Sequence, residues 1–121
     1  MGEGAGPPSP GDICWAWLDL VSGGEQGGRR PVVVVSGRGY LDVVDELAMV
    51  VPVTRVDRGW ENHVAVEAGV VSGFAMTEQV RTLSRQRLQG IVGAVEDDVL
   101  REIRRWLADF LELGEPWPGL P

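Results

Sequence analysis

Short apolar runs alternate with polar or glycine-rich segments along most of the chain. Many residues in these runs are β-branched, and some runs alternate apolar with polar positions, which is typical of strands in a sheet. We therefore predict strands over residues 13–20, 31–35, 48–54, 63–67, 74–83 and 91–95. Pro52 indicates that the third of these strands lies at an edge or carries a bulge, because proline cannot donate a ladder hydrogen bond.

The segments that separate these runs predict loops and turns. Residues 21–30 contain too much glycine for a regular element and predict a loop. Residues 37–46 are turn-rich with room for a short helical turn, and residues 84–88 predict a brief turn.

The C-terminal part of the chain carries a helical pattern. Apolar residues recur there at helical spacing and form a wide stripe of Val99, Leu100, Ile103, Trp106, Leu107, Phe110 and Leu111. The acidic residues 96–98 favour the start of this helix, and Gly114 and Pro116 favour its end. Several short strands followed by one helix predict a mostly β (α+β) fold, a small SH3-like antiparallel β-barrel whose C-terminal helix covers an opening.

The length of 121 residues suits one domain with one core. We expect a disordered leader over residues 1–10, a single domain over residues 11–114 and a frayed tail over residues 115–121. No apolar run approaches the roughly 20 residues of a membrane-spanning helix, and the N-terminus lacks the pattern of a signal peptide. Cys14 is the single cysteine, so no disulfide framework is possible. These features predict a cytoplasmic protein that does not bind membranes.

The charge distribution favours a narrow anion-binding site rather than a surface that coats nucleic acid. Eleven basic residues against eighteen acidic ones give a net charge of −7, and every basic residue is an arginine. Two stretches nevertheless contain arginine without any acid: residues 27–39, with Arg29, Arg30 and Arg38, and residues 81–88, with Arg81, Arg85 and Arg87. The planar guanidinium group suits phosphate because it offers several fixed donors.

The composition predicts chemistry without a metal or another cofactor. The chain has one His, one Cys and no ligand spacing such as HxxxH or CxxC. His63 begins an alternating strand, a position typical of a structural residue. Arginine, carboxylate and hydroxyl groups remain, and RNA suits them because its own 2′-OH lies beside the phosphate. Cleavage then needs only a base, an acid and a cation.

Four short motifs occur in order along the chain: Gly11-Asp12-Ile13, the segment from Glu25-Gln26 through Arg30-Pro31 to Val35, Val51-Pro52-Val53-Thr54, and Glu78-Gln79-Val80-Arg81-Thr82-Leu83. In this order and spacing they resemble the MazF/PemK (Kid-like) toxins of bacterial type II toxin–antitoxin systems. The resemblance extends over residues 11–113.

The resemblance implies a homodimer that cuts single-stranded mRNA sequence-specifically without a metal, by attack of the 2′-OH, and leaves a 2′,3′-cyclic phosphate and a 5′-OH. It also implies a cognate antitoxin with a flexible segment that binds over the RNA site. Arg30 and Thr54 match the catalytic positions of the family. The same motifs supply RNA-binding or supporting residues, which are Glu25, Gln26, Glu78 and Gln79.

Glu78 allows two interpretations. A continuous strand over residues 74–83 would place Met76, Glu78 and Val80 on one face, so that Glu78 interrupts an apolar side. Its carboxyl group would then be a base with a raised pKa or a buried partner of an arginine. Gly24 and Met76 stand where the Kid-like branch has a His and an Arg, so the identity of the general base and acid stays open.

Two alternatives from other functional classes remain at this point. A gyrase-poisoning toxin of the CcdB type shares the barrel fold, although residues 117–121 do not reproduce the C-terminal ending of that family. A non-catalytic SH3-like binding module would need neither Arg30 nor Thr54.

Overall fold

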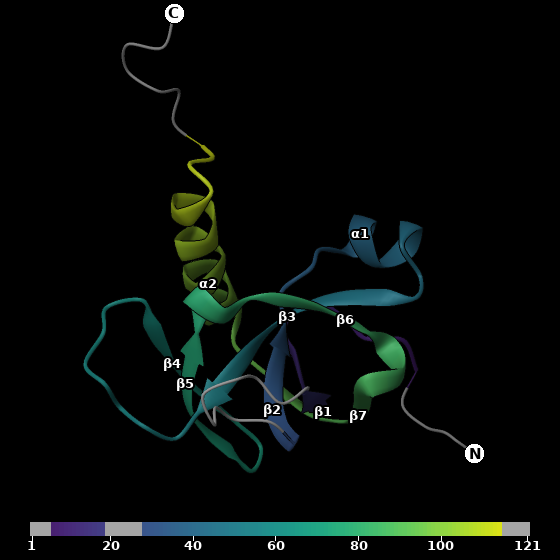
Figure 1. Cartoon of the computed structure of the whole chain (residues 1–121), viewed down its shortest axis with the longest axis horizontal. Coiled ribbons are helices and arrows are strands. Elements are labelled where there is room, and N and C mark those ends of the chain that lie inside the picture. The colour runs from purple at the N-terminus through teal and green to yellow at the C-terminus, as the bar shows by residue number, and fades with distance from the viewer. Residues whose placement is uncertain (1–5, 19–27, 115–121) are drawn as a thin grey trace, which may run out of the picture.

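Seven antiparallel strands form one strongly curved sheet in the computed structural model, which describes residues 6–18 and 28–114 (Figure 1). The elements in chain order are β1 (Asp12–Leu18), β2 (Gly28–Val34), α1 (Arg38–Val43), β3 (Leu47–Thr54), β4 (His63–Ala68), β5 (Val71–Met76), the 3₁₀ turn η1 (Thr77–Gln79), β6 (Arg81–Ser84), the 3₁₀ turn η2 (Arg85–Arg87), β7 (Leu88–Ala94) and α2 (Asp97–Phe110). The hydrogen-bonded order is β4-β5-β3-β2-β1-β7, and β6 pairs with β3 beside this path.

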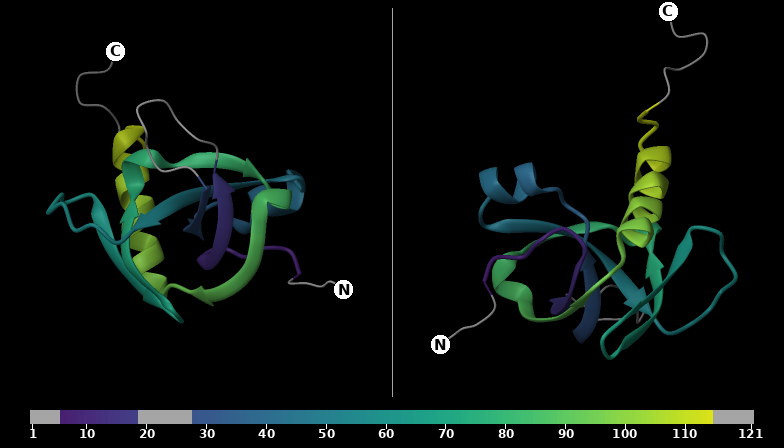
Figure 2. Two further views of the ribbon diagram at one scale, coloured as in Figure 1. Left: turned by 60° about the horizontal axis from the view of Figure 1, so that its bottom comes forward. Right: turned by 180° about the vertical axis from the view of Figure 1, so that it is seen from behind.

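The two ends of this path approach each other without forming a ladder (Figure 2). Gly69, in the turn between β4 and β5, has a φ of +60°, and a Cβ atom there would collide with the carbonyl oxygen of Val92 in β7. A Cβ atom on Gly93 would lie 3.2 Å from the backbone of Ala68. The predicted class, a mostly antiparallel β fold with a C-terminal helix, is confirmed, but the barrel is not closed by hydrogen bonds. The two edges of the sheet are instead in contact through their backbones at Gly69 and Gly93, where a larger residue would not fit.

Strand β3 lies at the centre of the sheet and has two different partners along one edge. Residues 47–50 pair with β6, whereas Val53 and Thr54 pair with β5. Pro52 stands between these two pairings and faces Val32 of β2 across the other edge. The prediction of an edge strand is therefore wrong. Proline is accommodated because its missing N–H falls where the partner of β3 changes.

The predicted strand over residues 74–83 is also wrong, because η1 interrupts it. The registers of β5 and β6 against β3 differ by three residues, which is the length of η1. The buried Thr77 fixes this turn, since its hydroxyl donates to the carbonyl oxygen of Asn62 at 2.7 Å. Two short strands thus share one edge of β3, and the chain between them cannot continue as a strand.

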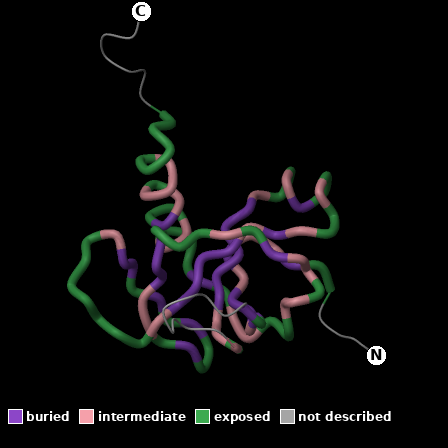
Figure 3. Tube along the Cα trace, viewed as in Figure 1, coloured by how far each residue is buried: buried purple, intermediate pink, exposed green. Residues whose placement is uncertain are grey.

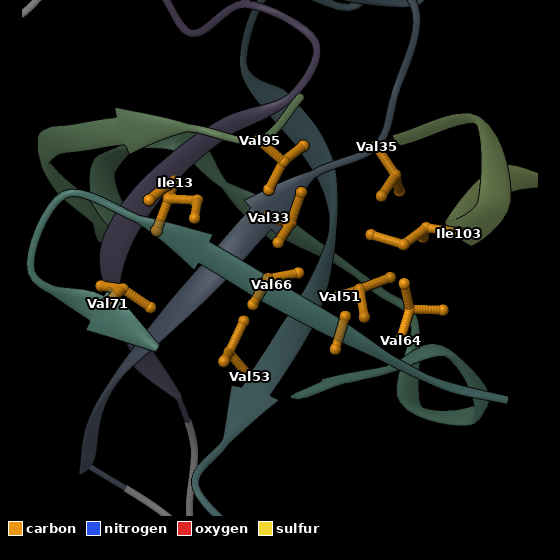
Figure 4. Close-up of a cluster of buried hydrophobic side chains, with 12 residues drawn as sticks. Ile13, Val33, Val35, Val51, Val53, Val64, Val66, Val71, Val95 and Ile103 are labelled. Carbon is orange, nitrogen blue, oxygen red and sulfur yellow. The ribbon is translucent and has the colours of Figure 1, made fainter. Parts of the chain in front are cut away.

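Apolar residues cover both faces of the central strands. Alternate residues point to opposite faces, so Val33 and Val35 join the cluster beneath α2, while Val32 and Val34 join a second cluster that includes Leu41 of α1. Figure 4 shows the first cluster, with Ile103 of α2 beside Val35 and Val64. This arrangement confirms the buried strand predicted from the uninterrupted apolar run at residues 31–35.

The helix α2 packs through its first half and extends beyond the sheet with its second half (Figure 3). Ile103 is fully buried, Val99, Leu100, Trp106 and Leu107 are half-buried, and Phe110 and Leu111 are exposed. The predicted apolar stripe therefore meets the core only in part. The helix ends at Phe110, and a left-handed residue follows at Glu112, earlier than the predicted end at Gly114.

The predicted leader is only partly within the described residues. Pro8 is buried, and the backbone N–H of Ser9 donates to the carboxylate of Asp12 at 2.7 Å. Residues 1–5 and the predicted tail at 115–121 lie outside the described part of the chain. In the described part, no helix has the length and apolar character that crossing a membrane requires.

Candidate functional site

Two adjacent cavities open where β2 begins and β3 ends. The first, of about 490 Å³, is lined by residues of β1, β2, β3 and β5, and the second, of about 360 Å³, by residues of β2, β3, η1 and the segment after β3. Arg30, Thr54 and Val56 line both cavities. The two residues predicted to be catalytic therefore stand on the wall that the cavities share.

Strand pairing explains why Arg30 and Thr54 meet. The β2–β3 register pairs Val32 with Pro52, and its continuation by two residues brings Arg30 opposite Thr54 on the same face. The Nη1 atom of Arg30 donates to the carbonyl oxygen of Val53 at 3.4 Å. Residues 21–30 were predicted to form a loop, but β2 already begins at Gly28. Arg30 is thus half-buried in a strand that is paired with β1, which limits the movement of its backbone.

Thr54 is the last residue of β3. Its Oγ1 atom accepts a hydrogen bond from the backbone N–H of Val56 at 3.1 Å, which turns the chain away from the sheet. The hydroxyl proton can still donate to a group in either cavity.

Arginine side chains dominate the charge around the cavities. Arg29, Arg30 and Arg55 line the first cavity, and no acidic residue of the described part of the chain lines it. The second cavity has Arg30, Arg58 and Arg81 beside the carboxylate of Glu78. The guanidinium of Arg29 lies 4.6 Å from the ring centroid of Trp15, and its Nε donates to Gln89 at 3.1 Å. A protein with a net charge of −7 thus concentrates positive charge at one place, which attracts anions.

Only some arginines of the two acid-free stretches in the sequence lie at these two cavities. Arg38 lies on α1 and is not among the lining residues, and Arg85 is used to support α1. Its guanidinium donates to the carbonyl oxygens of Leu41, Val44 and Leu47 at 2.5–3.0 Å. The side chain of Arg87 donates to the carbonyl oxygen of Trp17 at 3.4 Å. Of the second patch, Arg81 lines one of these two cavities, whereas Arg85 and Arg87 line neither.

Sequence reasoning missed two arginines of the site, Arg55 and Arg58. Both follow β3, immediately after the predicted catalytic Thr54, and that proximity was the available signal. The acidic Asp57 between them prevented the segment from standing out as basic.

Glu78 lines the second cavity from η1 and is not on an apolar strand face. Its Oε1 accepts from Nδ2 of Asn62 at 2.7 Å and lies 3.0 Å from Nε2 of His63, and its Oε2 lies 3.1 Å from the same nitrogen. Partial burial raises the pKa of Glu78, but hydrogen bonds from His63, from the backbone and from Asn62 outweigh it and lower the pKa below its ordinary value. The expectations of a raised pKa and of an arginine partner are both wrong, since the ionised carboxylate is held by His63.

His63 is buried at the start of β4, as its position in the sequence suggested, with 2% of its side chain exposed. It contacts Glu78 on one side, and the ring of Trp60 lies 4.8 Å away between centroids. Among the described residues, nothing hydrogen-bonds to its buried Nδ1. Because an ionised carboxylate only accepts hydrogen bonds, the contact with Glu78 places the proton of a neutral ring on Nε2.

Gln79 lines the second cavity beside Glu78. Glu25 and Gln26, the other two predicted supporting residues, lie outside the described residues. Across residues 6–18 and 28–114, no three His, Cys, Asp or Glu side chains are arranged to hold a metal ion. The groups that reach the two cavities are guanidinium, hydroxyl, amide and carboxylate. Such a set can hold a phosphate at the shared wall and stabilise additional negative charge on it.

Comparisons with known proteins agree with this geometry. A family model described as "PemK-like, MazF-like toxin of type II toxin-antitoxin system" matches residues 9–111. The endoribonuclease toxin MazF of Escherichia coli (strain K12) is 31% identical over 98 residues, which cover 80% of this chain and 87% of that protein. The crystal structure of MazF (Form-I) from Deinococcus radiodurans has a TM-score of 0.76 and 32% identity, covering 88% of this chain and 97% of that one. The MazE–MazF crystal structure (Form-III) from the same organism has a TM-score of 0.75 and 30% identity, covering 89% and 99%.

Proposed function

Since this chain belongs to the family of PemK-like, MazF-like toxins of type II toxin–antitoxin systems, we propose that its two cavities bind single-stranded RNA and that the shared wall cleaves it. The chain is an endoribonuclease toxin, in keeping with its relationship to MazF of Escherichia coli. This relationship favours ribonuclease activity over the gyrase-poisoning and binding-module alternatives.

The observation that carries the mechanism is the position of Arg30 and Thr54 between the cavities. An RNA strand that fills both cavities would place one phosphate against this wall. The 2′-OH gives its proton to a base and its oxygen attacks that phosphorus. The bond to the 5′-oxygen breaks as this oxygen takes a proton from an acid, so the products carry a 2′,3′-cyclic phosphate and a 5′-OH. Arg30 neutralises the charge that grows on the phosphorane, and the hydroxyl of Thr54 donates to a phosphate oxygen or contacts the 2′-OH.

The remaining arginines hold the flanking phosphates. Arg29 and Arg55 would contact the strand in the first cavity, and Arg58 and Arg81 in the second. Each such contact releases counterions from the RNA, so affinity would fall steeply with salt. The short basic lining within an acidic protein suits a short stretch of RNA.

The chain has a cognate antitoxin as a member of this family, and the matched MazE–MazF structure supports that partner. We infer that a flexible, acidic segment of the antitoxin covers the same arginines and competes with RNA. We further propose a two-fold homodimer, because Trp17, Val70 and Ile91 are apolar and exposed in the isolated chain. Light scattering at micromolar concentration that reports only the monomer mass would contradict the dimer.

RNA cleavage in EDTA tests the proposed reaction. The purified protein should cut single-stranded RNA without added metal, and end-group analysis should find cyclic phosphate and 5′-OH ends. Arg30→Ala should abolish most of the cleavage, whereas Arg101→Ala, which removes the same charge from the exposed face of α2, should not. Cleavage that requires magnesium, or products with 5′-phosphates, would refute the mechanism.

A further inference from the structure

The second cavity has features that phosphate binding alone does not explain. Trp60 lines it and is half exposed, with the guanidinium of Arg58 at 5.6 Å from its ring centroid, and Glu78 and Gln79 lie at the same cavity. A carboxylate that faces a bound phosphate would repel it, and an aromatic face adds nothing to the contact with phosphate. Both groups suit a flat, hydrogen-bonding ligand, and the bases of RNA are such ligands.

We propose that the second cavity is a base-selective pocket, in which Trp60 stacks on the RNA base beside the cleaved bond and Glu78 accepts a hydrogen bond from an amino group of that base. The proposal rests on the ribonuclease function above and adds the chemistry of its substrate selection. The cavity shares Arg30 and Thr54 with the first one, so the base it holds belongs to a nucleotide at the cleaved phosphate.

The hydrogen bonds of Glu78 determine which bases fit. An ionised carboxylate only accepts hydrogen bonds, and its protein donors leave it incompletely used. Oε1 receives Asn62 and His63, Oε2 lies 3.1 Å from the same Nε2 of His63, and a backbone N–H is a further donor to the carboxylate. With 32% of the Glu78 side chain exposed at the cavity, the carboxylate can accept one more donor. Adenine, cytosine and guanine carry an exocyclic amino group that can donate to this carboxylate. The donor on the pairing edge of uracil is N3–H, which lies between two carbonyl oxygens that would repel the carboxylate, so uracil is disfavoured.

His63 is the positioning residue of this pocket. Its Nε2 lies almost equally far from both oxygens of Glu78, at 3.0 and 3.1 Å, and this contact restricts rotation of the carboxylate. The same imidazole packs against the ring of Trp60 at 4.8 Å between centroids. The amide of Asn62 also donates to Thr77 at 3.1 Å, which ties η1 to the segment before β4. One buried side chain thus orients both the acceptor and the stacking face.

The experiment measures the cleavage rates of four oligonucleotides that differ only in the base at one of the two nucleotides flanking the cleaved bond. Cleavage sites are first mapped on a long RNA with the wild-type protein. Oligonucleotides around one such site then carry A, C, G or U at a flanking position, and single-turnover rates give the base preference. The wild type should prefer amino-bearing bases over uracil about tenfold at one of these positions, the scale of one good base contact.

The variants separate selection from cleavage. Glu78→Gln should reduce the preference to about threefold or less, because an amide offers a donor as well as an acceptor. Trp60→Leu should slow cleavage of all four substrates about tenfold, with little change in their ranking, since stacking is tolerant of sequence. Glu61→Gln removes a neighbouring exposed carboxylate that does not line the cavity and should leave rates and ranking unchanged.

Two variants test the positioning role. His63→Gln and Asn62→Ala should each weaken the base preference while Glu78 remains in place, with melting curves recorded for both. If His63→Gln does not fold, Asn62→Ala still tests the positioning of Glu78, because Asn62 is only half-buried in the segment before β4 and its replacement is better tolerated. A preference that survives Asn62→Ala and a folded His63→Gln would refute the positioning role.

The outcomes also distinguish this inference from the proposed function. If the wild type cuts no RNA, the ribonuclease function itself fails. If it cuts RNA and Glu78→Gln keeps the wild-type ranking of the four bases, the function stands and the base-selective pocket is wrong. If the wild-type protein prefers uracil at both flanking positions, the proposed recognition of a base amino group by Glu78 is also wrong.

Discussion

Replacing Arg30 with alanine tests whether this residue acts on the transition state or only docks the RNA. Its guanidinium stands on the wall between the two cavities, where the reacting phosphate is proposed to lie. A charge that neutralises the developing phosphorane contributes more in the transition state than in the bound substrate. The cleavage rate should therefore fall much more than the affinity for RNA.

The structure allows both magnitudes to be estimated. Loss of one donor aimed at developing charge lowers kcat by about 10²–10³-fold. Binding should weaken only several-fold, because four other arginines line the cavities, which are Arg29, Arg55, Arg58 and Arg81. One lost phosphate contact should make the slope of log K against log salt shallower by about 0.7 for a single strand.

Arg30 also has a small structural role that must be separated from catalysis. It lies in β2, where its Nη1 donates to the carbonyl oxygen of Val53 at the long distance of 3.4 Å. A hydrogen bond contributes about 1 kcal/mol, so loss of the bond to Val53 in Arg30→Ala should lower the Tm by roughly 4–8 °C for a domain of this size. The variant should remain folded at 25 °C.

The assay measures single-turnover cleavage and RNA affinity for the wild type, Arg30→Ala, Arg30→Lys and the control Arg101→Ala. Arg30→Lys should recover only part of the rate, because an ammonium group keeps the charge but loses the planar pair of donors. Equal losses of cleavage and binding in Arg30→Ala would reduce Arg30 to a docking contact. Unchanged cleavage would remove it from the site.

Three further predictions concern other groups. Thr54→Val, which removes the hydroxyl and keeps the shape, should slow single-turnover cleavage about tenfold or more, whereas Thr54→Ser should retain most of the rate. Glu78→Gln should lower the Tm at neutral pH, and this difference should shrink as the pH falls below the ordinary range of a carboxyl group. The pKa of Glu78 in the folded protein is below its ordinary value, so the ionised carboxylate stabilises the fold at any pH above the unfolded-state pKa. This stabilisation is lost as the pH falls through the folded-state pKa. A Tm difference between wild type and variant that does not change with pH would contradict this prediction. Burial, with a smaller effect of Asp12, raises the pKa of Cys14 to about 12, so iodoacetamide should label the native protein slowly and the denatured protein rapidly, as followed by mass spectrometry.

Local patterns in the sequence determined the fold class and the pair Arg30 and Thr54. The uninterrupted apolar run from Pro31 to Val35 predicts a strand that is buried on both faces, and both faces of this strand are covered in the structure. The apolar stripe around Ile103 predicts a helix that packs on the core. Arg30 and Thr54 were predicted to be catalytic because each lies in a short motif whose order along the chain identifies the family. Their meeting then follows from the pairing of β2 with β3.

Long-range contacts decided what the sequence pattern could not. The break at η1 arises because β5 and β6 share one edge of β3, and nothing within residues 74–83 records that competition. Arg85 and Arg58 are the same residue type at the surface of the same protein, yet one supports α1 and the other lines a cavity. The carboxylate of Glu78 is held by His63, fifteen residues away in the sequence. The state of a charged side chain depends on which donors and acceptors the folded chain brings within about 3 Å, and that is a property of the tertiary structure alone.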